Sequence, residues 1–598
     1  MKLSDYLMNF LAQHGASYVF MLPGGGCMHL VDSLGRENRL HYIPCLHEQA
    51  ASIAAESYAQ NTGTLGVVLV TTGPGGTNAI TGLAAAWIDS TPVLFLSGQV
   101  KRSDRLSSSG VRQMGSQEVD IVPIVKSLTK YAVTLMEPKD IRYELEKALY
   151  LAMTGRRGPV WIDIPLDVQA AEIEETSLRG YTPTKEETDV LSEEELKSIE
   201  AFIREARRPV LLVGNGARMA NKKSLRQLMK KTGFPVLLTW KSIDFLTYDD
   251  PQYFGCPGGM GHRYANFILQ NSDCLLILGS RLDSSLTAWN HENFAPHARK
   301  LMLDIDTHEI NKMQMNIDIK LTADLIKALP QLAQRNFDVD KNSLAKWISY
   351  CRQMKEKYPP VTADMYGEKN FVNAHAFIEI LSDALEPNDV IVPESSGAAG
   401  EITYQALRIK HGQRVRNAAG LGSMGFGVPY ALGACLASGK RRTVLIDGDG
   451  AFQLNIQELS TIALHHLPIK IFLWMNGGYA SIMGTQRNYF KGNFVAANRN
   501  SGLAIPDIGT VAAAYGFKVY YIEYTIDVRQ VIDHALETDG PVLVLVRTSP
   551  RETANPRVKS EKLPNGSMIS KPLEDMWPYL PSEEIAENMI ERCTNNDY

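Results

Sequence analysis

Two short segments in the last third of the chain end in residues that can bind a metal ion. The apolar run 444–446 and Asp447 lead into Gly448-Asp449-Gly450, and a second run, 469–474, leads into Asn476-Gly477-Gly478. Both runs are short and apolar, so each is predicted to be a buried parallel strand. Asp449, Asn476 and the carbonyl of Gly478 offer oxygen ligands, which Mg²⁺ prefers, usually together with the phosphates of its ligand. The sequence therefore predicts a Mg²⁺ site beside a diphosphate.

The residues that follow Gly450 are also predicted to favour binding of the diphosphate. Residues 451–459 have helical spacing, and a helix there would point its N-terminus at the diphosphate. Strand, G-D-G, helix, strand and N-G-G in this order resemble the diphosphate anchor of thiamine-diphosphate (ThDP) enzymes, and the 27 positions from Asp449 to Asn476 match that family. The alternative is a pair of ordinary strand-to-loop turns.

Glu48 is the predicted catalytic residue. It begins an Ala-rich helical segment, 48–60, directly after the predicted strand that ends near Cys45. Taken alone, such a carboxylate can simply stabilise the start of a helix. The segment H-E-x-A-A-x-x-A resembles the glutamate motif of ThDP enzymes, which implies a carboxyl group bonded to N1′ of the cofactor pyrimidine. An apolar setting would raise its pKa so that it can share a proton there. His47 is either a neighbour in the site or a structural residue.

Further motifs resemble the acetolactate synthase family over most of the chain. The resemblance implies that Met424 wedges beneath the cofactor, and that Ser396 and Gly397 contact the diphosphate from the other side. The motifs are Pro23-Gly24-Gly25, 71–78, 82–92, Gly98-Gln99, 155–165, 264–266, 279–283, 303–306 and 420–429. Predicted cofactor contacts are Gly25, Ser396, Gly397, Gly422, Met424, Gly448, Asp449, Gly450, Ala451, Asn476, Gly478, Tyr479, Ala480, Ser481 and Ile482.

The sequence of the middle domain is compatible with a second cofactor but does not require one. Acetolactate synthases hold FAD there, and four segments of this chain could form such a site: 214–218, 258–261, Arg281 and 304–306. However, residues 279–285 only partly match the family's G-x-R-F-D-D-R. The alternatives are an FAD site and a purely structural domain with glycine-rich turns.

Several departures from the family fall where the acceptor substrate would bind. Ser116 and Thr485 stand where the family has phenylalanine and tryptophan, and the segment 101–112 adds four basic residues. These residues would either meet an anionic acceptor or form a solvated basic loop. The resemblance implies decarboxylation of a 2-oxo acid, pyruvate first, and carboligation of the resulting acyl-anion equivalent. One alternative is a specialised carboligase that adds a two-carbon unit to a larger ketone such as a keto-sugar. Another is a non-catalytic ThDP-fold binding or regulatory subunit.

Length and composition set the frame for these sites. The 598 residues predict two to four domains, and 44% hydrophobic with 21% charged residues is ordinary for a globular protein. A net charge of −5 gives no electrostatic reason for nucleic acid or an anionic membrane as a partner. No apolar run approaches a membrane span, and the first residues do not form a signal peptide. Seven scattered cysteines without C-x-x-C spacing predict a reducing, cytoplasmic location. The family resemblance implies that the chain assembles into a homodimer or homotetramer.

Strand-like and helix-like segments alternate almost throughout, which predicts an α/β fold of three parallel-sheet domains. The predicted division is a pyrimidine-binding domain at 1–175, a middle domain at 190–340, a diphosphate-binding domain at 368–550 and a C-terminal tail at 551–598. Residues 172–195 read as a linker, and 334–370 as a second boundary. The tail is predicted to pack over a surface or to close a site.

Overall fold

The computed structural model describes residues 1–106, 109–183, 190–562, 564 and 566–590. Part of the predicted linker, residues 184–189, lies outside the described residues. No helix in the described part is both long enough and apolar enough to cross a membrane.

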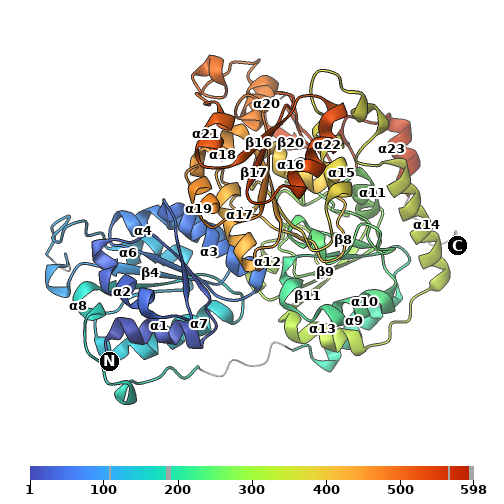
Figure 1. The fold of residues 1–598 in the computed structure, drawn as a ribbon. Coiled ribbons are helices and arrows are strands. Elements are labelled where there is room, and N and C mark those ends of the chain that lie inside the picture. Colours follow the sequence, from blue (N-terminus) through green and yellow to red (C-terminus); the bar gives the residue numbers. More distant parts are fainter. Residues whose placement is uncertain (107–108, 184–189, 563, 565, 591–598) are drawn as a thin grey trace.

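Three parallel sheets with their covering helices form the body of the molecule, which confirms the predicted α/β fold (Figure 1). The tail adds two small antiparallel pairs, β18 (Arg557–Val558) with β21 (Met576–Trp577) and β19 (Ser560–Lys562) with β20 (Met568–Ser570). The N-terminal sheet has the order β2 (His41–Pro44), β1 (Tyr18–Met21), β3 (Gly66–Val70), β4 (Val93–Gln99), β6 (Val160–Pro165), β5 (Tyr131–Thr134). The middle sheet has the order β11 (Ile319–Thr322), β10 (Arg299–Asp304), β9 (Cys274–Leu278), β7 (Pro209–Val213), β8 (Val236–Leu238). The C-terminal sheet has the order β13 (Arg414–Val415), β12 (Val390–Pro393), β14 (Thr443–Gly448), β15 (Ile469–Trp474), β17 (Val542–Val546), β16 (Lys518–Ile522).

The N-terminal and C-terminal sheets share one strand order. Numbered along the chain within each sheet, both run 2-1-3-4-6-5. In such a sheet the order reverses between the first and third strands, and ligands bind at the carboxyl ends of the strands beside that point. In the C-terminal sheet, this point lies between β12 and β14.

The strands with the weakest sequence pattern lie at sheet edges. Every interior strand is fully or almost fully buried and apolar, whereas β2, β5, β11, β13 and β16 keep exposed or half-exposed positions. A continuous apolar run marks a strand buried on both faces, but an edge strand carries polar residues and loses that signal.

Helices pack around each of the three parallel sheets (Figure 1). Those around the N-terminal sheet are α1 (Leu3–Gln13), α2 (Met28–Arg36), α3 (Glu48–Thr62), α4 (Pro74–Asn78), α5 (Ile80–Ile88), α6 (Ile121–Val125), α7 (Ile141–Met153) and α8 (Leu166–Gln169). The middle sheet has α9 (Glu193–Arg204), α10 (Lys222–Thr232), α11 (Arg263–Gln270), α12 (Thr307–Asn311), α13 (Leu325–Gln334) and α14 (Lys341–Lys357). The C-terminal sheet has α15 (Ala374–Ala384), α16 (Gly397–Ala406), α17 (Gly427–Ala437), α18 (Asp449–Phe452), α19 (Glu458–Leu464), α20 (Ala480–Tyr489), α21 (Ile508–Ala514) and α22 (Val528–Glu537).

The continuous helix predicted over 451–459 was wrong. The chain forms the short helix α18, a 3₁₀ turn at Gln453–Asn455, and then α19. The buried Asn455 side chain explains the break, because its Nδ2 donates to the carbonyl of Gly425 (2.7 Å) and turns the segment toward a neighbouring loop.

The predicted boundary at 334–370 is more than a linker, and the tail lies on the middle domain. Trp347 of α14 is buried, and its Nε1 donates to the carbonyl of Pro209 (2.9 Å). In the tail, the Val558 N–H donates to Gly259 O (2.7 Å), and helix α23 (Ser582–Asn588) ends where Asn588 O accepts from Asn271. The tail therefore packs over a surface of the middle domain.

Helices α3 and α17 join the N-terminal and C-terminal domains (Figure 1). They meet through small residues, and Ser57 Oγ donates to the Tyr430 carbonyl (2.6 Å). A Cβ atom at Gly433 would lie 2.1 Å from the carbonyl oxygen of Ala54. Since that neighbour is backbone, the two helices can approach this closely only with glycine at 433.

We expect Gly433→Ala to destabilise the protein by about 1–3 kcal/mol, because the added methyl must push the two helices apart. Thermal unfolding measures the effect. Gly35→Ala is the matched control, since Gly35 lies in α2 with open space around its Cβ position. That control should unfold at the wild-type temperature or slightly above. Equal melting temperatures for the two variants would contradict the assigned role of the contact.

Candidate active site

Three oxygen-bearing groups meet at the carboxyl ends of β14 and β15. Asp449 is buried, and its carboxylate accepts from the backbone N–H groups of Gly477 (2.7 Å) and Gly478 (3.2 Å). One terminal atom of the Asn476 amide lies 2.7 Å from the Gly478 carbonyl oxygen and 3.0 Å from Asp449 Oδ1. As nitrogen, this atom donates to both oxygens. As oxygen, it completes three converging oxygens, which is the arrangement a divalent cation requires.

The electrostatic setting of this corner favours a cation. Burial raises the pKa of Asp449 to about 6, although four backbone N–H groups lower it. A bound divalent cation would stabilise the charged carboxylate and offset its desolvation. The residues present therefore fit Mg²⁺.

The predicted diphosphate contacts gather around the same corner. A Cβ at Gly397, at the start of α16, would lie 3.1 Å from Ser481 Oγ, so the loop after β12 faces the start of α20. A Cβ at Gly450 would lie 2.5 Å from the Tyr479 ring, which explains that glycine by packing. The remaining predicted residues on these loops are Ser396, Gly448, Ala451, Ala480 and Ile482.

Met424 lies on a turn that precedes α17. The N–H groups of Leu421 and Gly422 both donate to the Ala418 carbonyl, and Gly422 has a φ of 63°. Such a backbone favours glycine, since a side chain there is strained. Met424 itself is half-buried.

Glu48 lies in a second group, on the N-terminal domain. It is the first residue of α3, is buried, and accepts from Asn78 Nδ2 of α4 (3.0 Å). His47 caps the same helix, because its Nδ1 accepts from the Gln49 N–H (3.0 Å), which favours the structural reading of this residue. Gly25 follows β1 and has open space where a side chain would be.

The two groups are connected only indirectly within one chain. Asn455 Nδ2 lies within reach of both Gln49 Oε1 (3.2 Å) and Gly425 O (2.7 Å), and the Leu46 N–H donates to Glu458 (2.9 Å). Across the described residues, no hydrogen bond or ion pair joins Glu48 to Asp449, Asn476 or Met424.

Two of the four basic residues in the segment 101–112 form ion pairs with acidic side chains. Arg102 Nε binds Asp167 (2.7 Å), and Arg105 lies 3.7 Å from Asp120. Ser107 and Ser108 lie outside the described residues. The structure thus leaves Lys101 and Arg112 as the cations of this segment that an anionic ligand could meet.

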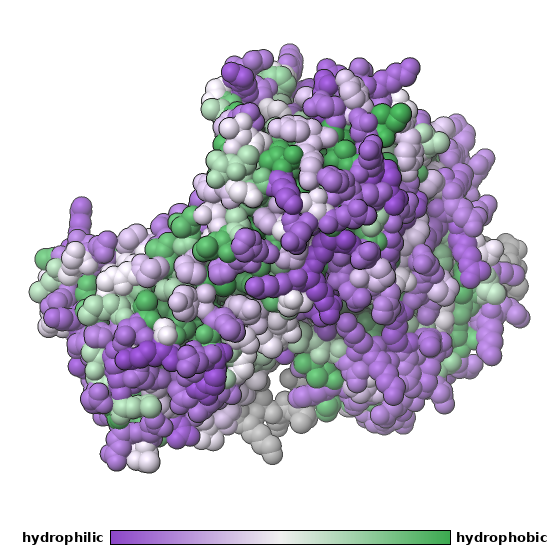
Figure 2. Space-filling view, viewed as in Figure 1, coloured by the Kyte–Doolittle hydropathy of each residue, from purple (hydrophilic) through white to green (hydrophobic). Residues whose placement is uncertain are grey.

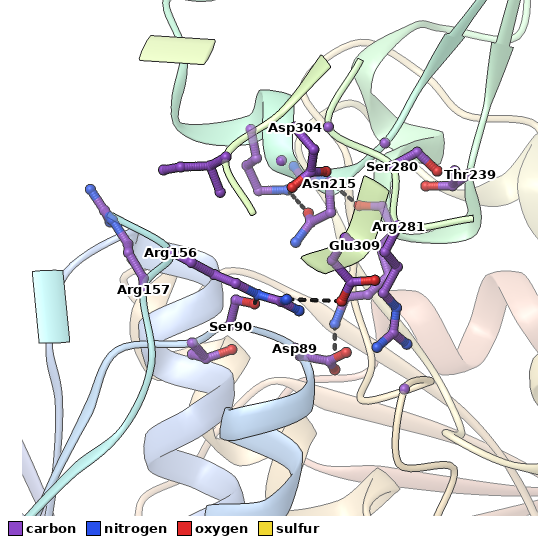
Figure 3. Close-up of a pocket in the computed structure, with 18 of the residues that line it drawn as sticks. Asp89, Ser90, Arg156, Arg157, Asn215, Thr239, Ser280, Arg281, Asp304 and Glu309 are labelled. Atoms are coloured by element: carbon purple, nitrogen blue, oxygen red, sulfur yellow. Dashed lines mark hydrogen bonds and ion pairs between the residues drawn. The ribbon is translucent and has the colours of Figure 1, made fainter. Parts of the chain in front are cut away.

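A large cavity of about 1140 Å³ lies where the middle domain meets the N-terminal domain (Figure 3). It is lined by residues of all four segments that sequence analysis singled out there, with Asn215, Gly258, Arg281 and Asp304 among them. A Cβ at Gly214 would lie 2.3 Å from the Gly279 carbonyl oxygen, so the loops after β7 and β9 pack backbone to backbone. The volume exceeds the usual range for small-ligand sites, which reaches about 1000 Å³.

The polar groups of this cavity suit a nucleotide. Asp304 ends β10 and is buried, and burial raises its pKa to about 6. In nucleotide-binding sheets, an acidic residue after a strand accepts from ribose hydroxyls. Arg156 from the N-terminal domain binds Asp306 (2.7 Å) and Glu309 (2.8 Å) across the cavity (Figure 3). The residues present therefore fit a dinucleotide such as FAD.

Sequence reasoning missed the polar residues that support these groups. Asn78, which holds Glu48, and Asn455, which bridges two loops, carry no motif of their own. Asn78 ends the quoted glycine-rich segment 71–78, which was the only signal for it.

The three domains match known family models in order. The matches are to the thiamine pyrophosphate enzyme N-terminal TPP binding domain at residues 1–124, the central domain at 196–332 and the C-terminal TPP binding domain at 396–546. The chain is also similar to the acetolactate synthase isozyme 2 large subunit of Escherichia coli, with 32% identity over 99% of this chain and 100% of that protein. The acetolactate synthase large subunit of Corynebacterium glutamicum is 33% identical over 90% of this chain and 85% of that protein.

A plant relative extends the comparison. The chloroplastic acetolactate synthase of Arabidopsis thaliana is 31% identical over 94% of this chain and 83% of that protein. Such identity over nearly the whole length, together with three matched domains, shows the family. The chain therefore belongs to the thiamine pyrophosphate enzymes, and it is an acetolactate synthase-like enzyme that depends on thiamine diphosphate.

Proposed function

We propose that this enzyme decarboxylates pyruvate and joins the resulting two-carbon unit to an acceptor ketone, with ThDP and Mg²⁺ as cofactors. The observation that carries the proposal is the convergence of Asp449, Asn476 and the Gly478 carbonyl at the carboxyl ends of β14 and β15, within the matched C-terminal TPP binding domain. When bound, ThDP supplies a nucleophilic carbon and takes up the electrons left when CO₂ departs.

The residues of the chain would bind the metal, position the cofactor and hold a proton. Asp449, Asn476 and Gly478 would hold Mg²⁺, and the loops at Ser396–Gly397 and Tyr479–Ile482 would enclose the diphosphate. Met424 would support the middle of the cofactor. Glu48, buried at the start of α3, would hold a proton at the pyrimidine ring, where a carboxyl group is needed to share it.

A second copy of the chain completes the site in this proposal. The family resemblance implies that Glu48 of one subunit faces the diphosphate site of another, and within one chain Glu48 bonds Asn78 instead. Exposed apolar side chains stand near both groups: Leu46 (55% exposed), Leu454 (44%) and Ile482 (45%). Figure 2 shows hydrophobic surface along the notch where the N-terminal and C-terminal domains meet. A homodimer or homotetramer would cover such surface.

We further propose FAD as the occupant of the middle-domain cavity. The cavity volume, the close backbone loops at Gly214 and Gly279, and the carboxylate of Asp304 support this choice. We place the enzyme in the cytosol, which suits the six free, buried cysteines in the described part of the chain.

The acceptor substrate is the open specificity question of this site. Thr485 is exposed on α20, in the helix whose first turn faces Gly397. A small residue at this position leaves room for an acceptor larger than pyruvate. The carboligase that extends a keto-sugar is therefore the second candidate function.

Acetolactate formation tests the main proposal. We expect the wild type with ThDP, Mg²⁺ and pyruvate to release CO₂ and form acetolactate, as measured by mass spectrometry. Glu48→Gln should lower kcat about 10²- to 10⁴-fold, since it removes the acid–base group, while ThDP still binds in calorimetry. Near-normal turnover in this variant would contradict the role of Glu48. CO₂ release only with an added keto-sugar would favour the second candidate.

Removal of the metal ligand gives a separate test. Asp449→Asn keeps an oxygen that can accept from the Gly477 N–H but loses the charge that Mg²⁺ requires. We expect an unchanged melting temperature and a loss of at least tenfold in Mg²⁺-dependent ThDP affinity, about 1.4 kcal/mol. Mg²⁺ titration of wild type and variant by calorimetry measures this loss. Equal affinities would exclude Asp449 as a ligand.

The flavin proposal predicts that the purified enzyme carries FAD, visible in its absorption spectrum. Asp304→Ala should weaken FAD binding about 10- to 100-fold, because it removes a buried charged acceptor. Ser284→Ala, at the exposed edge of the same cavity, is the matched control and should retain FAD. A wild-type chain that fails to bind added FAD would contradict the proposal.

A further inference from the structure

A buried ion pair stands where the three domains meet. Lys241, which follows β8 of the middle domain, places its Nζ 2.7 Å from Asp89 Oδ2 at the end of α5. The side chains are 14% and 2% exposed, respectively. The same Nζ donates to the backbone carbonyl of Asn417 in the C-terminal domain (2.8 Å). One ammonium group therefore holds a residue from each of the other two domains.

Asn417 begins the segment that carries the predicted cofactor contacts Gly422 and Met424. Its Oδ1 accepts from the Tyr404 hydroxyl (3.0 Å), and its Nδ2 donates to the Glu394 carbonyl (3.2 Å). The next residue, Ala418, donates its N–H to Ser395 Oγ (3.1 Å). Lys241 thus holds the point from which both the Ser396–Gly397 loop and the Met424 turn start.

Asp89 acts on this segment directly as well. Its Oδ2 binds Lys241, and its Oδ1 packs against Gly420. A Cβ atom added at Gly420 would lie only 2.4 Å from this Oδ1. Arg281 approaches the same glycine, with Nη2 3.2 Å from that Cβ position. Gly420 is therefore packed against charged groups that leave it no room for a side chain.

The ion pair and the segment together form one wall of the large cavity. Asp89, Lys241, Ala419 and Gly420 all line it, and Figure 3 shows Asp89 beside the end of the Arg281 side chain. Gly422 and Met424 follow in the same segment and are not among the residues that line the cavity. The segment held by the ion pair therefore runs from the cavity wall into the proposed cofactor contacts.

We propose that Lys241 is a positioning residue, which Asp89 orients, and that it fixes the Asn417–Met424 segment in the conformation that binds ThDP. The inference rests on the proposed ThDP site and assigns two residues that lie outside that site. A buried ion pair suits this role because its geometry is fixed from three domains at once. The loss of one partner alone would leave the other charge buried without its ion-pair partner, which is destabilising.

ThDP binding by calorimetry, beside thermal unfolding, tests the inference. Lys241→Met should weaken ThDP binding about tenfold and also lower the melting temperature. The double variant Lys241→Met/Asp89→Asn removes both charges, so its melting temperature should recover toward wild type. We expect its ThDP affinity to remain about tenfold weaker, because the segment is no longer held. Lys241→Arg keeps the charge and donors and should restore most of the affinity.

A second, largely buried pair provides the control, with side chains 19% and 7% exposed. Arg442 binds Asp389 through two bonds of 2.6 and 3.0 Å, at the amino ends of β14 and β12 and so at the opposite edge from the cofactor site. Arg442→Met/Asp389→Asn should leave ThDP affinity unchanged.

Two results would overturn the inference. Wild-type ThDP affinity in the Lys241/Asp89 double variant would show that the pair serves stability alone. A wild-type chain that binds no ThDP would instead contradict the proposed function itself, and the inference with it.

Discussion

The close approach of α3 and α17 is the constraint on which the arrangement of both halves of the site depends. The two helices can touch because Ala54, Ser57 and Gly433 present almost no side-chain bulk to each other. Glu48 lies at the first residue of α3, and Met424 lies three positions before α17. A shift of either helix would therefore move Glu48 or the turn that carries Met424, the two residues to which we assign roles at the cofactor.

Repetition of one sheet topology places both groups of residues at loops beside the carboxyl ends of parallel strands. Both outer sheets have the order 2-1-3-4-6-5, so both present loops at the same switch point. In the C-terminal sheet those loops carry oxygen ligands and glycine. In the N-terminal sheet they carry Gly25 and, through α4, the Asn78 that holds Glu48. One architecture thus presents the proposed diphosphate and Mg²⁺ residues in one domain and a buried carboxyl group in the other.

The middle domain is joined to the other two domains by ion pairs at its boundaries with them. Arg156 crosses from the N-terminal domain to Asp306 and Glu309, Lys241 crosses to Asp89, and Arg416 crosses from the C-terminal domain to Asp244. The Lys241–Asp89 and Arg416–Asp244 pairs are largely buried. Such pairs add little net stability compared with apolar packing, yet they constrain the geometry of the groups they join. That property suits a domain whose cavity is lined in part by Ala419 and Gly420 of the C-terminal domain.

The sequence by itself determined the α/β class, the interior strands and the family. Those features depend on local patterns: continuous apolar runs for strands buried on both faces, and fixed spacing between Asp449 and Asn476. Edge strands such as β5 and β16 escaped because half-exposed positions blur the pattern. Only the tertiary structure decided that Asn455 breaks the helix after Asp449, that four separate segments line one cavity, and that Lys241 meets Asp89. Each of these depends on contacts between residues up to 152 positions apart in the chain, and local spacing carries no record of such contacts.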